Sequence, residues 1–222
     1  MRQFTVELEV LNQKLLEMGG LVETAIHRSV QALADQDKEL AEQVIRDEAL
    51  INQRQMEIDD FVNSLFALRQ PVARDLRFLT SALKINTDLE RMGDLARHIA
   101  QRALSLMRHP LGQALVDIPR MASLVQSMVL QCLTAFVDGD ERLARSVLLQ
   151  DDEVDAMRDA VYERLLTVMQ NDPTLVPPAI DLIFVARHLE RIGDHATNIA
   201  EDVVFLVKGV DVRHRAERVE NV

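Results

Sequence analysis

The sequence predicts an all-α protein built from two tandem antiparallel three-helix bundles, giving six helices that arise by internal duplication. Three observations lead to this fold class. Helix-forming residues dominate, while only seven glycines and six prolines interrupt the 222 residues. Apolar residues recur at helical spacing, and one segment returns about 100 residues later.

Turn-forming residues divide the chain into six helical stretches. We predict helices over residues 3–34, 36–68 and 72–108 in the first half, and over residues 115–138, 140–170 and 177–208 in the second half. The residues at or near the boundaries are Pro71, Pro110, Gly112, Pro119, Asp138, Gly139, Pro173, Pro177 and Pro178. We therefore expect a first repeat over residues 1–110, a second over residues 111–209, and a polar tail over residues 210–222.

The duplication is visible in two pairs of segments. Residues 88–100 are DLERMGDLARHIA and residues 188–200 are HLERIGDHATNIA, so eight of thirteen positions are identical at an offset of 100. Apolar residues also recur every seven positions in the second helix of each half, at an offset of 103. These residues are Val44, Ile51, Ile58 and Leu65, and then Val147, Val154, Val161 and Val168. Two matches at nearly the same offset indicate a repeat of about 100 residues.

The third helix of each half carries an apolar seam with alternating steps of four and three residues. The two seams are Ile85, Leu89, Met92, Ala96, Ile99, Ala103 and Leu106, and Val185, Leu189, Ile192, Ala196, Ile199, Val203 and Leu206. This spacing is typical of helices that pack as in a coiled coil. We expect each half to be a three-helix bundle with these residues in its core.

Composition excludes several classes of protein. A net charge of −11 argues against nucleic acid as the main ligand, because phosphate binding needs a basic face. The N-terminus is too acidic for a signal peptide, and the longest apolar runs have only five residues. The single cysteine, Cys132, fits a reducing compartment and a place in the core. We expect a soluble protein of the cytoplasm.

Each repeat contains two acidic residues four positions apart, Glu90 with Asp94 and Glu190 with Asp194. This spacing puts both carboxylates on one helix face, about 145–185° away from the centre of the apolar seam. A glycine, Gly93 or Gly193, lies inside each motif, although glycine costs about 1 kcal/mol in a helix relative to alanine. We expect another backbone or a ligand to approach closely there.

The preceding helix of each half adds a second set of oxygen ligands. Asp151 and Asp155 correspond, at the offset of 103, to Glu48 and Asn52. Converging carboxylates are unfavourable unless a cation offsets them, and Mg²⁺, Mn²⁺ or iron suit oxygen-rich sites. Asn52 removes one charge from the first site. Further candidates one or two turns along are His98, Asn198 and Asp202.

Two simpler hypotheses compete with a metal site. The acids could form a solvated face with local ion pairs, because Arg91, Arg97 and Arg191 lie three positions from Asp94 or Asp194. A metal-dependent hydrolase or oxidase is a weaker hypothesis, because a buried di-iron bundle needs Glu-x-x-His motifs that face the core. The sequence also lacks a glycine-rich phosphate loop and a His-Glu-x-x-His motif. We therefore expect no catalytic centre.

Three stretches resemble the PhoU family of phosphate-transport accessory proteins: RQPVARDLR (69–77), DLERMGDLARHIA (88–100) and IFVARHLERIGDHATNIAEDVVFLVKG (183–209). The resemblance spans essentially the whole chain. It implies a cytoplasmic homodimer that couples the ATPase subunit of a phosphate ABC transporter to a sensor histidine kinase. It also implies a non-enzymatic negative regulator of phosphate-starvation signalling and phosphate uptake.

The resemblance further implies metal ions as cofactors, namely iron, zinc, magnesium or manganese in multinuclear sites. The residues that match the family's metal motifs are Glu90, Asp94, Glu190 and Asp194, and less securely Asp151, Asp155, Glu48 and Asn52. The alternative is a metal-independent helical interaction module whose acidic faces dock basic partners.

Overall fold

Six α-helices make up the described part of the computed structural model, which covers residues 2–108, 118–210 and 212. They are α1 (Arg2–Asp35), α2 (Lys38–Arg69), α3 (Ala73–Leu106), α4 (Ile118–Asp138), α5 (Glu141–Asn171) and α6 (Val176–Lys208), with a short 3₁₀ helix, η2 (Pro173–Leu175), before α6. The predicted helix ends agree with these bounds to within two residues, except for the predicted start of the fourth helix. That start, at residue 115, and most of the predicted tail lie outside the described residues.

The second helix of each half begins in the same way. Asp37 precedes α2, and its carboxylate accepts a hydrogen bond from the backbone N–H of Leu40 at 3.0 Å. Asp140 precedes α5 and accepts from the backbone N–H of Arg142 at 2.9 Å. An aspartate in this position satisfies amide groups that the first turn leaves without partners. The two caps are 103 residues apart, which is the offset found in the sequence.

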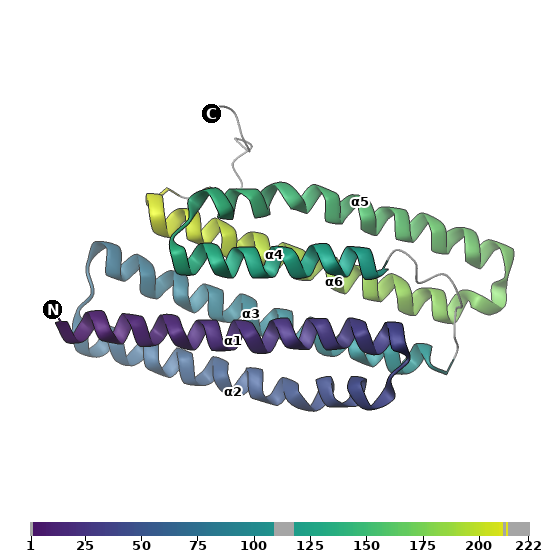
Figure 1. Cartoon of the computed structure of the whole chain (residues 1–222), viewed down its shortest axis with the longest axis horizontal. Helices are drawn as coiled ribbons and strands as arrows, with labels where there is room; N and C mark the ends of the chain where they lie inside the picture. The colour runs from purple at the N-terminus through teal and green to yellow at the C-terminus, as the bar shows by residue number, and fades with distance from the viewer. Residues whose placement is uncertain (1, 109–117, 211, 213–222) are drawn as a thin grey trace.

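The helices form two antiparallel three-helix bundles that lie side by side, as the sequence predicts (Figure 1). Helices α1, α2 and α3 form one bundle, and α4, α5 and α6 form the other. Helices α3 and α6 make the most extensive interhelical contact of the fold, and α1 also touches α4. The third helix of each repeat therefore packs both within its own bundle and against the other one.

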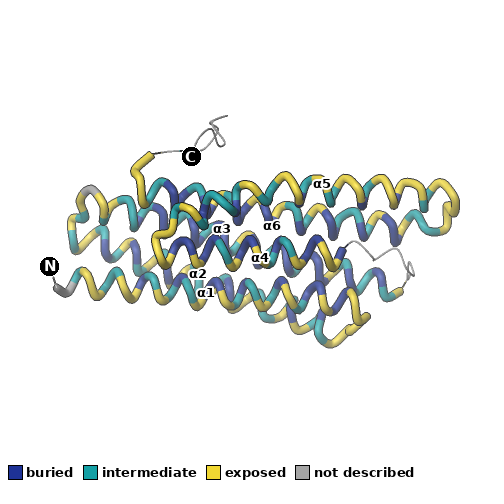
Figure 2. The backbone as a smooth tube through the Cα atoms, turned by 45° about the horizontal axis from the view of Figure 1, so that its top comes forward, coloured by how far each residue is buried: buried dark blue, intermediate teal, exposed yellow. Residues whose placement is uncertain are grey.

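A large apolar core runs through both bundles (Figure 2), and a small separate cluster of Ala32, Ala41, Val44 and Ala100 lies within the first bundle. All seven seam residues of α3 are buried, and so are six of the seven on α6. Leu206, near the end of α6, packs against this core while partly exposed, and Val168 on α5 is also only partly buried. Because side chains of both halves belong to one cluster, we expect the two bundles to unfold together.

Polar contacts also join α3 to α6 along their length. Ion pairs join Lys84 to Asp202 (2.8 Å) and Arg102 to Asp181 (3.0 Å), and Nδ1 of His195 lies within hydrogen-bond distance of Asp88 Oδ1, at 2.8 Å. One contact between α3 and α6 occurs a second time between the corresponding residues of the two repeats. Asn198 Nδ2 donates to Asp88 Oδ1 at 3.4 Å, while the rings of their counterparts, His98 and His188, stack with centroids 5.4 Å apart. The two halves are therefore related by an approximate two-fold axis through the α3–α6 contact.

Helix α4 is the one helix in the described part of the chain with the length and composition of a membrane span. Half of its apolar stretch is buried inside the fold, including Met121, Val125 and Met128. A core helix has the same composition, so the finding is weak evidence for a span. Cys132 on this helix is fully buried, as predicted, and burial raises the pKa of its thiol.

Candidate functional site

The structure gathers the candidate residues of the first half between α2 and α3. Glu48 and Asn52 lie on α2, where Asn52 Nδ2 donates to Glu48 Oε1 at 2.8 Å. Glu90 and Asp94 lie on α3, and all four side chains are half-buried. Burial raises the pKa of Glu90, and the negative charges of Asp94 and then Glu48 raise it further. These residues therefore form a first acidic cluster that spans two helices.

An arginine neutralises part of this first acidic cluster. Arg97 Nη2 donates to Asp94 Oδ1 at 3.1 Å, and Arg97 Nε lies 3.7 Å from Glu48 Oε1. The same Nη2 is 3.2 Å from Nε2 of His98. The guanidinium thus lies between carboxylates of α2 and α3, where it supplies positive charge.

The corresponding residues of the second half form a second acidic cluster, between α5 and α6. Asp151 and Asp155 lie on α5, and Glu190 and Asp194 lie on α6. The pKa of Asp194 is raised to about 6, first by desolvation and then by the charges of Glu190, Asp151 and Asp155. Four carboxylates therefore act on one another in the second half, whereas the first half has three and the amide of Asn52.

The second acidic cluster also has an arginine, but it comes from the other helix. Arg158 Nη1 on α5 donates to Asp155 Oδ1 at 2.8 Å and to Glu190 Oε1 at 2.6 Å. At the repeat offsets, Arg158 corresponds to Gln55 and Arg97 corresponds to Thr197. The two halves thus place a guanidinium among their carboxylates independently, from α3 in one and from α5 in the other.

The two motif glycines have different surroundings. A Cβ added at Gly93 would lie 2.8 Å from Ile51 Cδ1 and 3.1 Å from Ile51 Cγ2, which is too close. A Cβ at Gly193 would have Val154 Cγ1 as its nearest neighbour, at 3.6 Å, which is ordinary contact. A close neighbour is therefore present at Gly93, but it is a side chain of α2 rather than the backbone or ligand that was predicted, and the neighbours of Gly193 are side chains at ordinary contact distance.

The residue types of both clusters fit a hard cation, but the side chains are arranged around arginine. Carboxylate and amide oxygens are suitable ligands for Mg²⁺ or Mn²⁺. The pKa values of Glu90 and Asp194 are raised first by burial and then by neighbouring carboxylates, whose charge a cation would offset. Within the described residues, no three Asp, Glu, His or Cys side chains converge closely enough to hold a metal ion. Arg97 and Arg158 contact carboxylate oxygens that a metal ion would use as ligands.

The three further candidate ligands, Asp202, Asn198 and His98, contact residues of the other half. Asp202 pairs with Lys84, Asn198 donates to Asp88, and the ring of His98 stacks on His188. Of these, His98 alone also lies beside an acidic cluster, through its contact with Arg97.

Sequence reasoning missed the ionic contacts that cross between helices. Arg158 follows Asp155 by three positions, so its place on the same helix face could have been predicted, but its bond to Glu190 depends on the packing of α5 on α6. The buried contact of Asp88 with His195 was harder to predict from the sequence, because it is not repeated: the corresponding residues of the other half are His188 and Leu95.

Both repeats and nearly the whole chain are similar to known proteins. The PhoU domain family matches the chain twice, over residues 15–103 and 118–203. Over 228 aligned residues, the chain is 43% identical to a Pseudomonas aeruginosa protein named phosphate-specific transport system accessory protein PhoU homolog, covering 99% of the chain and 93% of that protein. A Caulobacter vibrioides protein of the same name is 38% identical, with 99% of the chain and 96% of that protein covered.

Two crystal structures have the same fold. PhoU from Pseudomonas aeruginosa superposes with a TM-score of 0.91 at 42% sequence identity, covering 93% of this chain and all of that one. The phosphate transport system regulatory protein PhoU from Streptococcus pneumoniae superposes with a TM-score of 0.88 at 33% identity, covering 94% of this chain and 99% of that one.

Proposed function

The chain belongs to the PhoU family, and we propose that it is a non-enzymatic negative regulator of phosphate-starvation signalling and phosphate uptake. The observation that carries the proposal is that the family match covers both repeats and nearly the whole length of relatives named as accessory proteins of the phosphate-specific transport system. A long helical scaffold with two acidic faces suits binding to partners rather than catalysis.

In this proposal the protein couples the ATPase subunit of a phosphate ABC transporter to a sensor histidine kinase. It acts in the cytoplasm as a homodimer and reaches the membrane only through these partners. The duplicated fold supports such an adaptor role, because its approximate two-fold symmetry offers two related surfaces, one on each bundle.

Deletion of the gene in phosphate-replete cells tests the regulatory role. We expect genes of the phosphate-starvation response to be expressed although phosphate is plentiful, and we expect the wild-type chain supplied in trans to restore repression. Unchanged expression after deletion would refute the proposal. Co-purification with the transporter ATPase and with the kinase tests the coupling separately.

We also propose that the acidic clusters bind metal ions of the group iron, zinc, magnesium and manganese. Glu48, Asn52, Glu90 and Asp94 would hold the ion in the first half. Asp151, Asp155, Glu190 and Asp194 would hold it in the second half. A bound cation would offset the repulsion among the carboxylates, which adds to the effect of burial on the pKa values of Glu90 and Asp194, and would tie the second helix of each bundle to the third.

Metal content of protein purified without chelator tests this second proposal. We compare wild type with the double variants Glu90→Ala/Asp94→Ala and Glu190→Ala/Asp194→Ala. The matched control is Asp60→Ala/Glu163→Ala, which removes two exposed acids, one from α2 and one from α5, that lie outside the clusters. We expect each cluster variant to lose the metal of its own half and the control to retain both. Equal metal content in all four proteins would defeat the proposal.

The alternative is a metal-independent module whose acidic clusters dock basic partners. The arginines favour it, because Arg97 and Arg158 demonstrate that both clusters accept a guanidinium. This alternative predicts that a chelator leaves partner binding intact, whereas Asp94→Lys/Asp194→Lys abolishes it. Loss of partner binding on chelation, restored by adding a divalent cation, would decide for the metal sites.

A further inference from the structure

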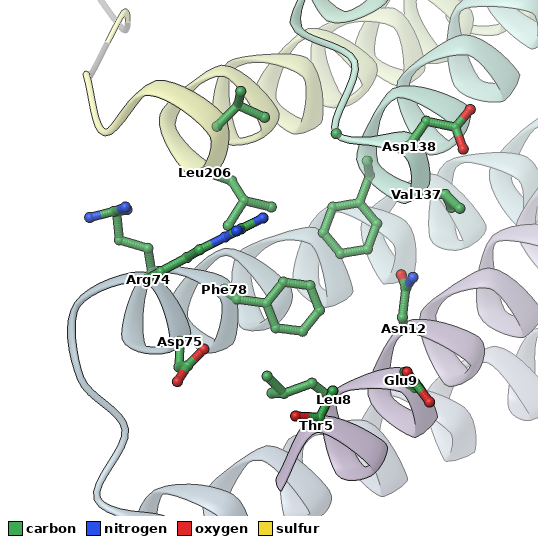
Figure 3. Close-up of a pocket in the computed structure, with 14 residues that line it drawn as sticks. Thr5, Leu8, Glu9, Asn12, Arg74, Asp75, Phe78, Val137, Asp138 and Leu206 are labelled. Carbon is green, nitrogen blue, oxygen red and sulfur yellow. The ribbon is translucent and has the colours of Figure 1, made fainter. Parts of the chain in front are cut away.

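A hollow of about 700 Å³ lies between the two bundles, at the end of the molecule where α3 begins and where α4 and α6 end (Figure 3). Side chains of α1, α3, α4 and α6 line it. Along α3, Arg77 in its wall is thirteen residues before Glu90, or about 20 Å at 1.5 Å per residue. The hollow is therefore separate from the acidic clusters.

An aromatic pair lines the hollow. The rings of Phe78 on α3 and Phe136 on α4 stack with centroids 5.8 Å apart and an interplanar angle of 14°. Leu8 on α1 and Leu206 on α6 extend this surface. Ligand pockets are commonly lined by apolar and aromatic side chains with a few polar groups that fix orientation, and a flat ring is the group that stacks best on such a pair.

Arg77 provides a positive charge that the described residues do not pair. No hydrogen bond or salt bridge of its guanidinium falls within the described part of the chain, and its Nε is buried without a partner. Its Cζ lies 3.8 Å from the place of a Cβ at Gly209, so the guanidinium faces the C-terminal end of α6, whose dipole is negative. The repeat counterpart of Arg77 is Pro177, so the second bundle has no equivalent. A partly buried guanidinium whose Nε lacks a partner is suited to pairing with an anion.

The two sides of the hollow differ in polarity. Arg74 lies on the α3 side, while Glu9, Asn12 and Asp138 lie on the opposite side (Figure 3). The Oδ1 atom of Asn12 is buried without a partner. Carboxylates and an amide oxygen accept hydrogen bonds, so this second side favours amino or hydroxyl donors. Asp75 also lines the α3 side, and its charge disfavours a bare polyanion there.

We propose that this hollow binds a mononucleotide, with the phosphate near Arg77 and Arg74, the base stacked on the aromatic pair, and donor groups facing Asn12. Such a molecule carries an anion at one end and amino groups on a flat ring at the other, which matches both sides of the hollow. Inorganic phosphate would leave the aromatic surface and the acceptors unused, and a nucleoside would leave the arginines unpaired.

Titration of the full chain with adenosine monophosphate tests the proposal, by isothermal calorimetry and by amide chemical shifts. A pocket of this kind is expected to bind with a Kd of about 10⁻⁴ M. We expect adenosine and inorganic phosphate to bind at least roughly tenfold more weakly, which corresponds to the loss of one good polar or stacking contact. Equal affinity for inorganic phosphate, or equal affinity for adenosine, would overturn the proposal, and so would the absence of binding.

Three variants locate the site. Arg77→Gln removes the unpaired charge, and Val137→Trp adds a large ring at a partly exposed position of the wall, so we expect each to weaken binding at least roughly tenfold. Arg187→Gln removes an exposed arginine of α6 outside the hollow and serves as the matched control with unchanged affinity. Unchanged thermal unfolding of Val137→Trp ensures that lost binding reflects the filled space.

Binding that survives both wall variants would overturn the proposal. The variant Glu90→Ala/Asp94→Ala should bind adenosine monophosphate as wild type does, because the first acidic cluster is remote from the hollow. The two proposals can fail independently. If no nucleotide binds, the proposed regulatory role is unaffected. If deletion of the gene refutes the regulatory role, nucleotide binding is still expected.

Discussion

Alanine at Gly93 and alanine at Gly193 should have opposite effects on stability, although the two glycines occupy the same position of the repeat. Both lie inside a helix, where alanine is favoured over glycine by about 1 kcal/mol. At Gly193 the new methyl group finds its nearest neighbour at 3.6 Å, so we expect Gly193→Ala to raise the free energy of unfolding by about 0.5–1 kcal/mol.

At Gly93 the same methyl group would overlap with Ile51, which is 2% exposed and has little room to move. The Cδ1 atom at 2.8 Å can move by rotation about χ2, but Cγ2 at 3.1 Å moves only if χ1 changes, and a helix leaves isoleucine one strongly preferred χ1 rotamer. Overpacking of this kind costs about 1–3 kcal/mol, which exceeds the gain from alanine. We expect Gly93→Ala to lower the free energy of unfolding by about 1 kcal/mol, so that the two variants differ by about 2 kcal/mol.

Urea unfolding followed by circular dichroism measures both effects, with unchanged m-values as the check that only stability has changed. Ile51→Val removes the Cδ1 atom and supplies a test of the cause. Alone it should cost about 0.5–1.5 kcal/mol, but in the Gly93→Ala background the cost should shrink by about 1 kcal/mol. If Gly93→Ala stabilises the protein as much as Gly193→Ala does, or if the two substitutions are additive, the close approach of α2 is not the reason for Gly93.

Three further outcomes are expected. His195→Ala should lower the free energy of unfolding in urea by about 2 kcal/mol, because it removes the hydrogen bond between the His195 ring and the carboxylate of Asp88, which is buried between the bundles; a loss below about 1 kcal/mol would contradict this role. Arg69 holds the pKa of Glu7 below its ordinary value near 4.5, so the pair stabilises the fold above that pH, and its contribution is lost as the pH falls through the lowered pKa. Wild type and Glu7→Gln should therefore converge in stability in acid, and a constant difference between them would exclude the ion pair as its source. The thiol of Cys132 is fully buried and its pKa is raised, so iodoacetamide should modify it only after unfolding, as intact mass spectrometry would detect.

Much of the fold could be predicted because the core residues of a helical bundle recur at a regular spacing in the sequence. The seam of α3 alternates by four and three residues, and each of its members, from Ile85 to Leu106, is buried. Prolines marked the helix ends because they interrupt helices, whereas the capping aspartates Asp37 and Asp140 were not part of the prediction. The shared core of the two bundles was less accessible to prediction, because periodicity within a helix does not reveal which other helix covers a given face.

The candidate site could be predicted in part. Spacing and repetition placed Glu90 with Asp94 on one face and paired them with residues of the preceding helix, and the structure brings these residues together. Spacing could not predict that Arg158 would reach Glu190, since a contact between helices depends on their rotation and crossing. Gly193 was interpreted like Gly93 on the strength of the repeat alone, whereas the space beside a glycine depends on its neighbour.

The unequal clusters follow from duplication with later divergence at single positions. Asn52 stands where the second half has Asp155, so the first acidic cluster has one carboxylate fewer, while each cluster has one bridging arginine. The second cluster therefore retains more negative charge. The pKa of Asp194 is raised to about 6 by burial first and by the charges of Glu190, Asp151 and Asp155 after it. A cation of any kind, whether a metal ion or the guanidinium of a partner, gains more from the second cluster than from the first at equal geometry. Because α3 and α6 hold the clusters on opposite sides of one shared core, the two halves can differ in occupancy without a change in fold.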